Sequence, residues 1–505
     1  MKQLLLICVF TFGVFNLFGQ SGTFDKTFGV GGKVITSFKG NDYGRSLCLQ
    51  STGKILVAGY TDSSGFQNCV ITRYNVNGSL DNTFGIGGKL TTTIVPNYWG
   101  TPMAVQGDDK IIIAGLLGND ILVGRYTANG KLDNTFGTSG FASGKLDINY
   151  THVARAIVLQ VDGKIIVTSS GYNNFSGRKF EMVRFGADGT LDNAFGNMSK
   201  VVTNFGSYTD VVTSMVIQQD GKIILAGYVD NGANGNDFAI ARYNANGTLD
   251  TKFGVGGKVL TDFYDNEDIA ICISLQTNGK LVLAGYAQIS SVKVLALARY
   301  STNGFLDSSF GINGKVVNDT ANIKFETARA ILIQKDGKIV ISGGTKGAKD
   351  WDFLLARFHI DGTVDNSFGT AGRVVFDIGE DDLANAIAIQ NDNKIIIAGY
   401  TGTSTNHKIT LVRFDNSITN VKSNVAYNSH YSLIPNPSTG VFNIISSNNM
   451  ATIQTVEIYN AIGEMVIVNS QLNTNCIDIS NSPNGIYFAR IIYGEESCLF
   501  KLMKE

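Results

Sequence analysis

Short apolar runs alternate with polar, glycine-containing turns along most of the chain. The stretch around Gln218 shows the order: TSMVIQ, KIILAGY, FAIARYN and KVLTDF are four apolar runs separated by turns such as QDG and ANGTLDTKFGVGG. Runs of this length, rich in Val, Ile, Phe and Tyr and bounded by Gly, Asn and Asp, predict β-strands, and no helical period separates them. The pattern therefore predicts an all-β fold built from four-stranded units, with strands a, b, c and d in chain order.

Three sequence marks recur in a fixed order, each in seven copies. A Phe-Gly pair stands in the turn before strand d, at Phe28, Phe84, Phe136, Phe195, Phe253, Phe310 and Phe368. A marker glutamine ends strand a, at Gln50, Gln106, Gln160, Gln218, Gln276, Gln334 and Gln390. A marker arginine followed by Tyr or Phe ends strand c, at Arg73, Arg125, Arg184, Arg242, Arg299, Arg357 and Arg413. The recurrence predicts a repeat architecture.

Four-stranded units repeated in this way predict a seven-bladed β-propeller over residues 20–416. The alternative is a β-solenoid, which usually has a shorter period and fewer strands per turn. The ends of the array favour the propeller, because the first segment supplies only a strand d and the last unit stops after strand c, near Phe414. We expect the strand at Lys33–Phe38 to complete the blade that begins near Ala384, which would close the ring and leave no open sheet edge there.

The repeat carries a family resemblance. The segment AIVLQVDGKIIV…RFGADGTLDNAFG resembles the delta-60 repeat, a bacterial propeller repeat similar to the NHL blade. The resemblance covers about Gly22–Asn416 and implies a fold, not an activity.

The remainder of the chain has a different texture. Residues 417–430 are polar and carry no repeat mark, which predicts a linker. Alternating stretches in residues 431–505, such as TVEIYNAIGEMVI and NGIYFARIIYG, predict a small C-terminal β-sandwich. This segment resembles the C-terminal sorting domain of the type IX (Por) secretion system of Bacteroidetes. The matching positions include Pro435, Asn436, Pro437, Gly440, Gly463 and Gly485. The resemblance implies handling by the type IX secretion machinery and then release or surface attachment; the alternative is an ordinary accessory β-domain.

The first residues, MKQLLLICVFTFGVFNLFGQ, have a lysine, an apolar run and a small residue near position 19. They predict a signal peptide over residues 1–19, with a membrane anchor as the alternative. No other segment is apolar for long enough to span a membrane, so we expect no transmembrane segment in the mature chain. The expected location is outside the cell or attached to the outer membrane surface, after periplasmic export. In that oxidising environment Cys476 and Cys498 are candidates for a disulfide.

Charge and motifs exclude several functions. The net charge is −1, from 41 basic and 42 acidic side chains, which argues against a nucleic-acid partner. The glycine-rich stretch LDNTFGIGGK has the wrong spacing for a phosphate-binding loop and precedes a strand. Its aspartate, Asp81, is expected to close a turn or to pair with the marker arginine. The four histidines are scattered and no nucleophile-elbow motif is present, so no catalytic residue is identified.

The b–c and d–a loops vary in sequence and share one face of the predicted propeller, so that face is the candidate binding surface. Eight residues before the marker glutamines stand Asp42, Tyr98, His152, Asp210, Asp268, Glu326 and Asp382. We expect them to circle the mouth of the central channel, where the five carboxylates suit Ca²⁺ or a polar ligand. The alternative is a set of solvated acids that cap strand starts. Aromatic residues in the same loops suit a carbohydrate or peptide, or pack the loops: Tyr43, Tyr98, Trp99, Tyr150, Tyr208 and Tyr264.

These observations predict a non-enzymatic binding or scaffold module at the cell surface, with a glycan, peptide or surface polymer as partner. The alternative is a carbohydrate-active enzyme, a lyase or hydrolase, with its site at the channel mouth. No cofactor is indicated other than the possible Ca²⁺.

Overall fold

The computed structural model describes residues 21–416 and 431–505. Within these ranges it leaves out 64, 97–99, 145–151, 174–176, 207–208, 233–234, 319–324, 348, 447–452, 461–464, 470–475 and 494–495. The predicted signal peptide (1–19), the predicted linker (417–430), Tyr98, Trp99 and Gly463 therefore lie outside the described residues. The chain divides into two compact units, Gln20–Ile418 and a unit that contains Thr419–Glu505.

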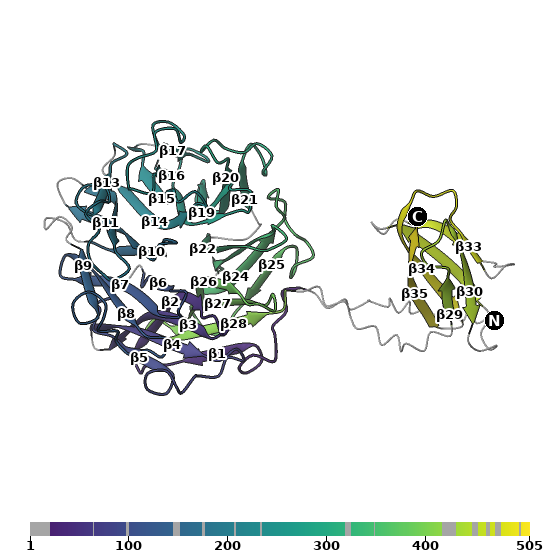
Figure 1. Ribbon diagram of the computed structural model, residues 1–505, viewed down its shortest axis with the longest axis horizontal. Helices are drawn as coiled ribbons and strands as arrows, with labels where there is room; N and C mark the ends of the chain where they lie inside the picture. Colours follow the sequence, from purple (N-terminus) through teal and green to yellow (C-terminus); the bar gives the residue numbers. More distant parts are fainter. Residues whose placement is uncertain are drawn as a thin grey trace, which may run out of the picture. The chain divides into compact units, whose positions relative to one another are not determined.

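The first unit is a β-propeller, with antiparallel sheets arranged around a common centre (Figure 1). The first two sheets are β2 (Asn41–Leu49), β3 (Ile55–Ser63), β4 (Phe66–Tyr74), β5 (Lys89–Thr91) and β6 (Met103–Val105), β7 (Ile111–Leu117), β8 (Asp120–Tyr126), β9 (Phe141–Gly144). The next two are β10 (Ala154–Leu159), β11 (Ile165–Asn173), β12 (Gly177–Phe185), β13 (Lys200–Thr203) and β14 (Asp210–Ile217), β15 (Ile223–Asp230), β16 (Asn236–Tyr243), β17 (Lys258–Thr261). In each sheet the first strand is the predicted strand a and lies on the inner side.

The following sheet has eight strands. It contains β18 (Asp268–Leu275), β19 (Leu281–Ile289), β20 (Val292–Tyr300), β21 (Lys315–Asn318) and β22 (Phe325–Ile333), β23 (Ile339–Lys346), β24 (Trp351–Phe358), β25 (Arg373–Phe376). A single parallel pair, Lys293 with Phe325, joins its two halves. With these halves counted separately the arrangement agrees with the expected number of blades, which stays a prediction.

The last propeller sheet joins the two ends of the array. It contains β26 (Leu383–Ile389), β27 (Ile395–Thr403), β28 (Asn406–Phe414) and β1 (Lys33–Thr36). The strand expected at Lys33–Phe38 is β1, which pairs antiparallel with β28 from Lys33 opposite Val412 to Thr36 opposite Ile409. The segment before β1 adds a backbone bond from Asp25 N–H to the Arg413 carbonyl, at 2.9 Å.

The middle strands are apolar because both of their faces are covered. In β3, for example, the first seven residues are all buried. The apolar clusters run between neighbouring sheets: one of them joins Ile166 and Phe180 to Val212 and Leu225 of the next sheet. Continuous apolar runs are expected for strands that are buried on both faces. The core therefore consists of layers between sheets.

A repeated ion-pair cluster lies at the turn between strands c and d. Each marker arginine pairs with the aspartate of that turn at 2.7–2.9 Å; the pairs are Arg73–Asp81, Arg125–Asp133, Arg184–Asp192, Arg242–Asp250, Arg299–Asp307, Arg357–Asp365 and Arg413–Asp25. Each guanidinium also lies 4.2–4.9 Å from the ring centre of a Phe-Gly phenylalanine. The expected pairing of Asp81 with the marker arginine is thus observed, alongside a turn closed by a bond from Thr83 N–H to Asp81.

The glycine after each marker phenylalanine has a steric reason. Gly85 has φ +51°, and a Cβ there would lie 2.2 Å from the backbone oxygen of Lys89. Only glycine fits this close approach without a shift of the chain. The stretch LDNTFGIGGK therefore shapes a turn.

The C-terminal unit is a two-sheet β-sandwich. One sheet contains β29 (Tyr431–Ile434), β30 (Val441–Ser446) and β33 (Cys476–Asp478); the other contains β32 (Met465–Asn469), β31 (Ile453–Asn460), β34 (Gly485–Tyr493) and β35 (Glu496–Lys504). Both sheets contribute to one buried cluster, for example through Phe442 and Ile491. The side chain of Cys498 is not described, so its pairing with Cys476 stays a prediction. No helix in the described part of the chain could cross a membrane.

Two of the predicted sorting positions, Asn436 and Gly440, have structural roles, and three more can be placed in the fold. Asn436 links the segment before β30 to β35, because its side chain donates to the Lys501 carbonyl and accepts from Met503 N–H. Pro435 and Pro437 flank this asparagine. A Cβ at Gly440 would lie 2.6 Å from Ser480 Cα. Gly485 is the first residue of β34.

Candidate binding site in the central channel

The residues eight positions before the marker glutamines are buried. Asp42, Asp210, Asp268, Glu326 and Asp382 are 0% exposed and His152 is 1% exposed. These six side chains are therefore not open to the channel, and the acids are not solvated, whereas the expected capping of strand starts is described below. That they bind a ligand stays a prediction. Tyr98 and Trp99, the other predicted site residues, are not described.

Four of the acids instead hold the d–a loop. Each accepts a backbone N–H from four or five residues earlier in the chain: Phe38 for Asp42, Phe205 for Asp210, Phe263 for Asp268 and Ile378 for Asp382. Glu326 pairs with Arg373. This explains why strand a begins with an acid so often, since a carboxylate satisfies loop N–H groups that have no partner in a sheet.

His152 and Asp268 differ from the other members of this register. His152 Nδ1 lies 2.9 Å from Glu181 Oε2 inside the sheet that contains β12. Burial raises the pKa of Asp268 to about 7, and the carboxylate of Asp262 adds to this effect against the loop hydrogen bond from Phe263. Asp268 therefore lies in a place with excess negative charge.

The side chains that do enter the channel come from a different register, five residues before the marker glutamines. In six inner strands the pairing register shifts at this position, which is a β-bulge. The bulged residues are Arg45, Arg155, Thr213, Ile271, Arg329 and Asn385. A bulge adds one residue to one strand and re-aims its side chain. All six line one cavity of about 430 Å³.

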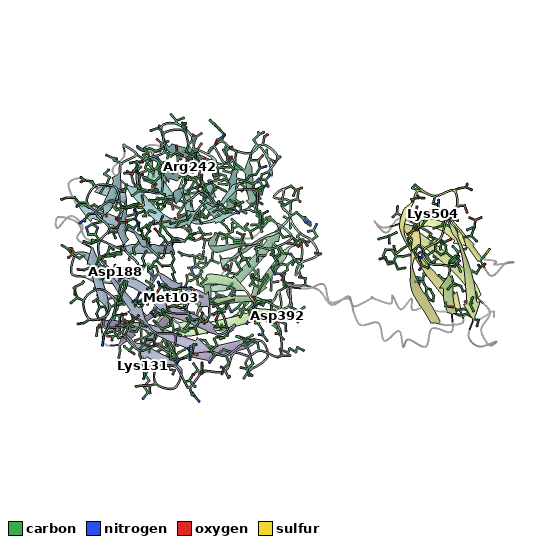
Figure 2. All side chains as sticks on the ribbon, in the orientation of Figure 1. Met103, Lys131, Asp188, Arg242, Asp392 and Lys504 are labelled. Carbon is green, nitrogen blue, oxygen red and sulfur yellow. The ribbon has the colours of Figure 1, made fainter. Side chains whose placement is uncertain are left out.

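The cavity lies at the end of the channel where the inner strands begin. Its other lining residues are Tyr43, Ser46, Tyr60, Gly100, Thr101, Pro102, Leu383 and Tyr400. Met103 of β6 follows the lining residue Pro102 in the sequence, and Figure 2 shows it toward the centre of the ring. The same figure shows Lys131 toward the rim. The expected face and the expected Tyr43 therefore belong to the cavity, whereas the expected ring of acids does not.

Arg45 lies among tyrosines. Its guanidinium carbon is 5.4 Å from the ring centres of Tyr43 and Tyr60 and 5.7 Å from that of Tyr400. Its Nη2 donates to Tyr60 Oη at 3.2 Å, and its Nη1 is 3.5 Å from Asn385 Oδ1. The Tyr43 and Tyr60 rings stack at 4.7 Å. The result is an aromatic wall with a cation at its edge.

Arg155 and Arg329 add positive charge to the same cavity. Burial lowers the pKa of Arg155 to about 10, and Arg178 and Arg329 contribute to the lowering. Burial also lowers the pKa of Arg329, with a further contribution from Arg45. Among the described residues, no carboxylate lies within 4.0 Å of the Arg45 or Arg329 guanidinium, and the Nε atoms of both are buried without a hydrogen-bond partner. Three guanidinium groups thus share one cavity, which suits an anion.

A signal for this site exists in the sequence. Five residues before the marker glutamines, the order along the chain is Arg45, Thr101, Arg155, Thr213, Ile271, Arg329 and Asn385. The residue type at this position changes from unit to unit, unlike the marker residues that build the scaffold. Sequence reasoning missed it because a regular strand alternation does not predict which residue a bulge turns into the channel.

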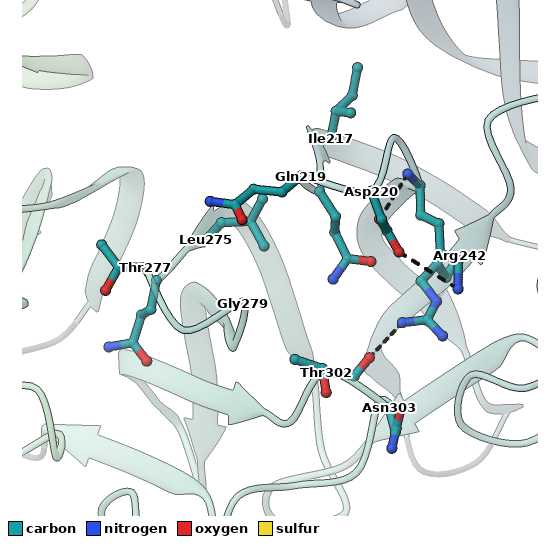
Figure 3. A pocket seen from close by; sticks show the side chains of 12 residues that line it. Ile217, Gln219, Asp220, Arg242, Leu275, Thr277, Gly279, Thr302 and Asn303 are labelled. Atoms are coloured by element: carbon teal, nitrogen blue, oxygen red, sulfur yellow. Dashed lines mark hydrogen bonds and ion pairs between the residues drawn. The ribbon is translucent and has the colours of Figure 1, made fainter.

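A second cavity, of about 500 Å³, lies on the opposite face between the a–b turns of two neighbouring sheets (Figure 3). Arg242 and Gln218 line it together with Gln276 and Thr302, and the Arg242 guanidinium donates to the Thr302 carbonyl. These are repeat residues, and a similar groove lies beside Gln160. The groove therefore follows from the stacking of the sheets.

Comparison with known proteins agrees with this architecture. The family described as "Domain of unknown function (DUF5122) beta-propeller" matches residues 50–84, 106–136, 160–195, 218–253, 276–310 and 334–368. Each match runs from a marker glutamine to a marker phenylalanine. The unit that starts at Gln390 obtains its last strand from β1, so it cannot match as one continuous stretch. A second family, "Secretion system C-terminal sorting domain", matches residues 432–505.

No curated protein matches the chain. The solved structures that are similar include the extracellular domain of the putative hybrid two component system BT3049 from B. thetaiotaomicron, at 11% identity and TM-score 0.40, covering 94% of this chain and 57% of that one. The polysaccharide lyase Uly1 is 13% identical with a TM-score of 0.44, and the match covers 74% of this chain and 90% of that one. A puromycin hydrolase is 9% identical with a TM-score of 0.42, and the match covers 90% of this chain and 59% of that one. The chain thus spans less than two thirds of the length of the BT3049 domain and of the puromycin hydrolase.

At such identities and TM-scores the solved structures carry no argument about fold or activity. The sorting domain implies interaction with the type IX secretion machinery, followed by secretion or attachment to the cell surface. The chain therefore carries a β-propeller repeat domain of the DUF5122 family followed by a type IX secretion C-terminal sorting domain.

Proposed function

We propose that this exported propeller is a non-enzymatic binding module whose central channel binds an acidic glycan. The observation that carries the proposal is the placement of Arg45, Arg155 and Arg329 at bulges that open into one cavity. Guanidinium groups recognise carboxylate, sulfate and phosphate through paired hydrogen bonds. Among the described residues no carboxylate lies within 4.0 Å of Arg45 or Arg329, and a bound anion would offset the cost of these half-buried charges.

The aromatic wall selects a glycan among the possible acidic ligands. Tyr43, Tyr60 and Tyr400 present rings and hydroxyl groups beside Arg45. Such side chains offer an apolar face and a polar tip in one place. Thr101, Thr213 and Asn385 add neutral polar groups that suit sugar hydroxyls. A surface location after type IX export gives such a module access to extracellular polymers.

Calorimetric titration of the full chain with uronic-acid or sulfated oligosaccharides, and with neutral oligosaccharides of equal length, tests the proposal. We expect binding of the acidic series that weakens with salt. Arg329→Gln should weaken it about tenfold or more, since a hydrogen bond to a charged group contributes roughly 1.5–3 kcal/mol. Lys131→Gln, in an exposed turn on the rim, is the matched control. Equal binding of neutral and acidic sugars, or an unchanged affinity in the Arg329 variant, would refute the proposal.

A second candidate is a lyase, in which a base takes the proton next to a uronate carboxylate and the glycosidic oxygen leaves from the neighbouring carbon with a proton, so that a double bond forms between the two carbons. The observation in its favour is the Tyr43 hydroxyl 2.9 Å from His407 Nδ1, close to Arg45. It ranks second because burial raises the pKa of Tyr43 to about 12 and lowers that of His407, which is itself 6% exposed. Incubation of the acidic oligosaccharides with the chain, followed by detection of unsaturated products, distinguishes the two: product that is lost in Tyr43→Phe supports the lyase.

A further inference from the structure

Three carboxylates converge on the face of the d–a loops, where β16 and β17 meet the start of β18. Asp237 belongs to β16, Asp262 follows β17, and Asp268 is the first residue of β18. One oxygen of each lies within 4.8 Å of the others. Asp237 and Asp268 are 2% and 0% exposed, whereas Asp262 is half-buried. Three like charges therefore share a space of the size of one ion.

Each of the two buried acids has one oxygen in use and one without a partner. Asp237 Oδ2 accepts from Asn231 Nδ2 at 2.8 Å, and Asp268 Oδ2 accepts from Phe263 N–H at 2.6 Å. The Oδ1 atoms of both acids are buried and have no hydrogen-bond partner among the residues that the structure describes. A buried carboxylate oxygen without a partner is costly, and two of them belong to this one group of three carboxylates, which points to a missing ligand.

The same three positions at another junction show how the propeller normally compensates this charge. Between β12 and β14 they are occupied by Lys179, Asn204 and Asp210. Lys179 Nζ lies 3.0 Å from Asn204 Oδ1 and 3.8 Å from Asp210 Oδ2. An ammonium group of the chain thus neutralises the buried acid at the start of strand a.

The junction that closes the ring repeats this solution. There the three positions are Lys408, Ser37 and Asp42, and Lys408 Nζ lies 3.9 Å from Asp42 Oδ2. In both junctions the formal charges of the three residues sum to zero. At the junction of Asp237, Asp262 and Asp268 they sum to −3, because lysine and a neutral residue are both replaced by aspartate.

The nearby lysine does not supply the missing charge. Lys315 Nζ donates to the backbone carbonyl of Asp262. At the other two junctions Lys258 and Lys89 make the same contact, to the carbonyls of Asn204 and Ser37. This lysine is therefore a constant part of the scaffold, and in the described part of the chain no added cation replaces the lysine that Asp237 displaces.

We propose that Asp237, Asp262 and Asp268 bind a divalent cation, Ca²⁺, in the place that a lysine ammonium occupies at the equivalent junctions. A set of carboxylate oxygens alone suits a hard cation, and the half-buried Asp262 leaves a side open for water ligands. Ca²⁺ accepts irregular geometry more readily than Mg²⁺. The ion would tie the loop before β18 to β16, which is the role of Lys179 and Lys408 elsewhere.

Titration of the full chain with CaCl₂ and MgCl₂, by calorimetry and by thermal unfolding, tests the proposal. We expect one equivalent of Ca²⁺ with a rise in melting temperature, and weaker binding of Mg²⁺. Asp262→Asn, which copies Asn204, should weaken Ca²⁺ binding about tenfold or more. Asp237→Lys copies Lys179 and should fold, melt independently of Ca²⁺ and bind none at this junction.

The chain also offers a matched control. Asp352, Asp377 and Asp382 occupy the same three positions at the junction of β24 and β26, but among the described residues their oxygens do not form a group within 4.8 Å. Asp352→Lys should therefore leave Ca²⁺ binding intact. Absence of heat and of a melting shift up to about 10 mM Ca²⁺, well above the weak range of extracellular calcium modules, overturns the proposal. Loss of binding in the Asp352 variant with binding retained in Asp237→Lys also overturns it.

Discussion

The most sharply defined energetic prediction concerns the buried pair Arg357–Asp365. Both side chains are 2% exposed, and Arg357 Nε lies 2.7 Å from Asp365 Oδ2. Lys338 Nζ contacts the same oxygen at 3.0 Å, and Ser367 donates its N–H and hydroxyl to Oδ1. Asp365→Asn keeps the shape and can keep the Oδ1 contacts, but it removes the charge that faces the guanidinium.

The magnitude follows from what the substitution leaves behind. Loss of one partner of a buried ion pair costs about 3–5 kcal/mol, since the other charge stays buried. Arg357 still donates to Ser21 Oγ and Asn416 Oδ1, at 2.9 and 2.8 Å, and Lys338 can turn toward water. We therefore expect the lower end of the range, about 3 kcal/mol, which is about a hundredfold in the unfolding equilibrium.

Urea unfolding of the full chain, followed by circular dichroism and tryptophan fluorescence, measures this difference. Asp336→Asn is the matched control, because Asp336 contacts the same Lys338, at 3.9 Å, but has a side chain 56% exposed. Exposed substitutions of this kind change stability by within about 0.5 kcal/mol. If the two variants differ by less than about 1 kcal/mol, the Arg357–Asp365 pair does not stabilise the propeller as a buried ion pair.

Two further predictions concern the turns between strands c and d. The pKa of Asp133 is lowered to about 2, chiefly by the Thr135 hydroxyl, and further by the Thr135 N–H, Arg125 and Lys110 against the opposing effect of burial. In the unfolded chain the pKa of an aspartate is about 3.9. The contribution of Asp133 to stability is therefore present above pH 4 and is lost as the pH falls toward 2. Asp133→Asn should therefore flatten the acid limb of an unfolding profile, and an unchanged profile would contradict this assignment. Gly85→Ala should destabilise the chain more than Gly87→Ala, since both have positive φ but only a Cβ at position 85 meets a backbone oxygen, at 2.2 Å; equal melting temperatures would show that the loop relaxes freely.

The scaffold could be read from the sequence because its residues recur. The marker arginine and the turn aspartate keep the same spacing in every continuous unit, so the sequence offered their pairing as one of two roles for the aspartate, and the structure shows both. The pairing of β1 with β28 also follows, since the chain offers a strand d at one end and an incomplete unit at the other. Contacts within one repeat unit, or between that unit and the next, can be predicted without knowing the rest of the ring.

The candidate sites could be predicted only in part, because they depend on deviations from the repeat. The sequence places Asp268 and its equivalents at the starts of inner strands. Only the structure shows that their side chains are buried, where Asp268 accepts a loop N–H group. Bulges decide that Arg45, Arg155 and Arg329 enter the channel, since one extra residue in a strand reverses which side chain faces the centre.

The sequence by itself determined the strand order, the turn chemistry and the closure of the ring, because these follow from local pattern and repetition. Only the tertiary structure decided which charges are compensated. Asp237 and Lys179 occupy the same position in the repeat, and the difference between an internal ion pair and a place with three carboxylates depends on what Asp262 and Asp268 bring from the neighbouring strands. Coulomb interactions act through space, over distances that the order of residues along the chain does not contain.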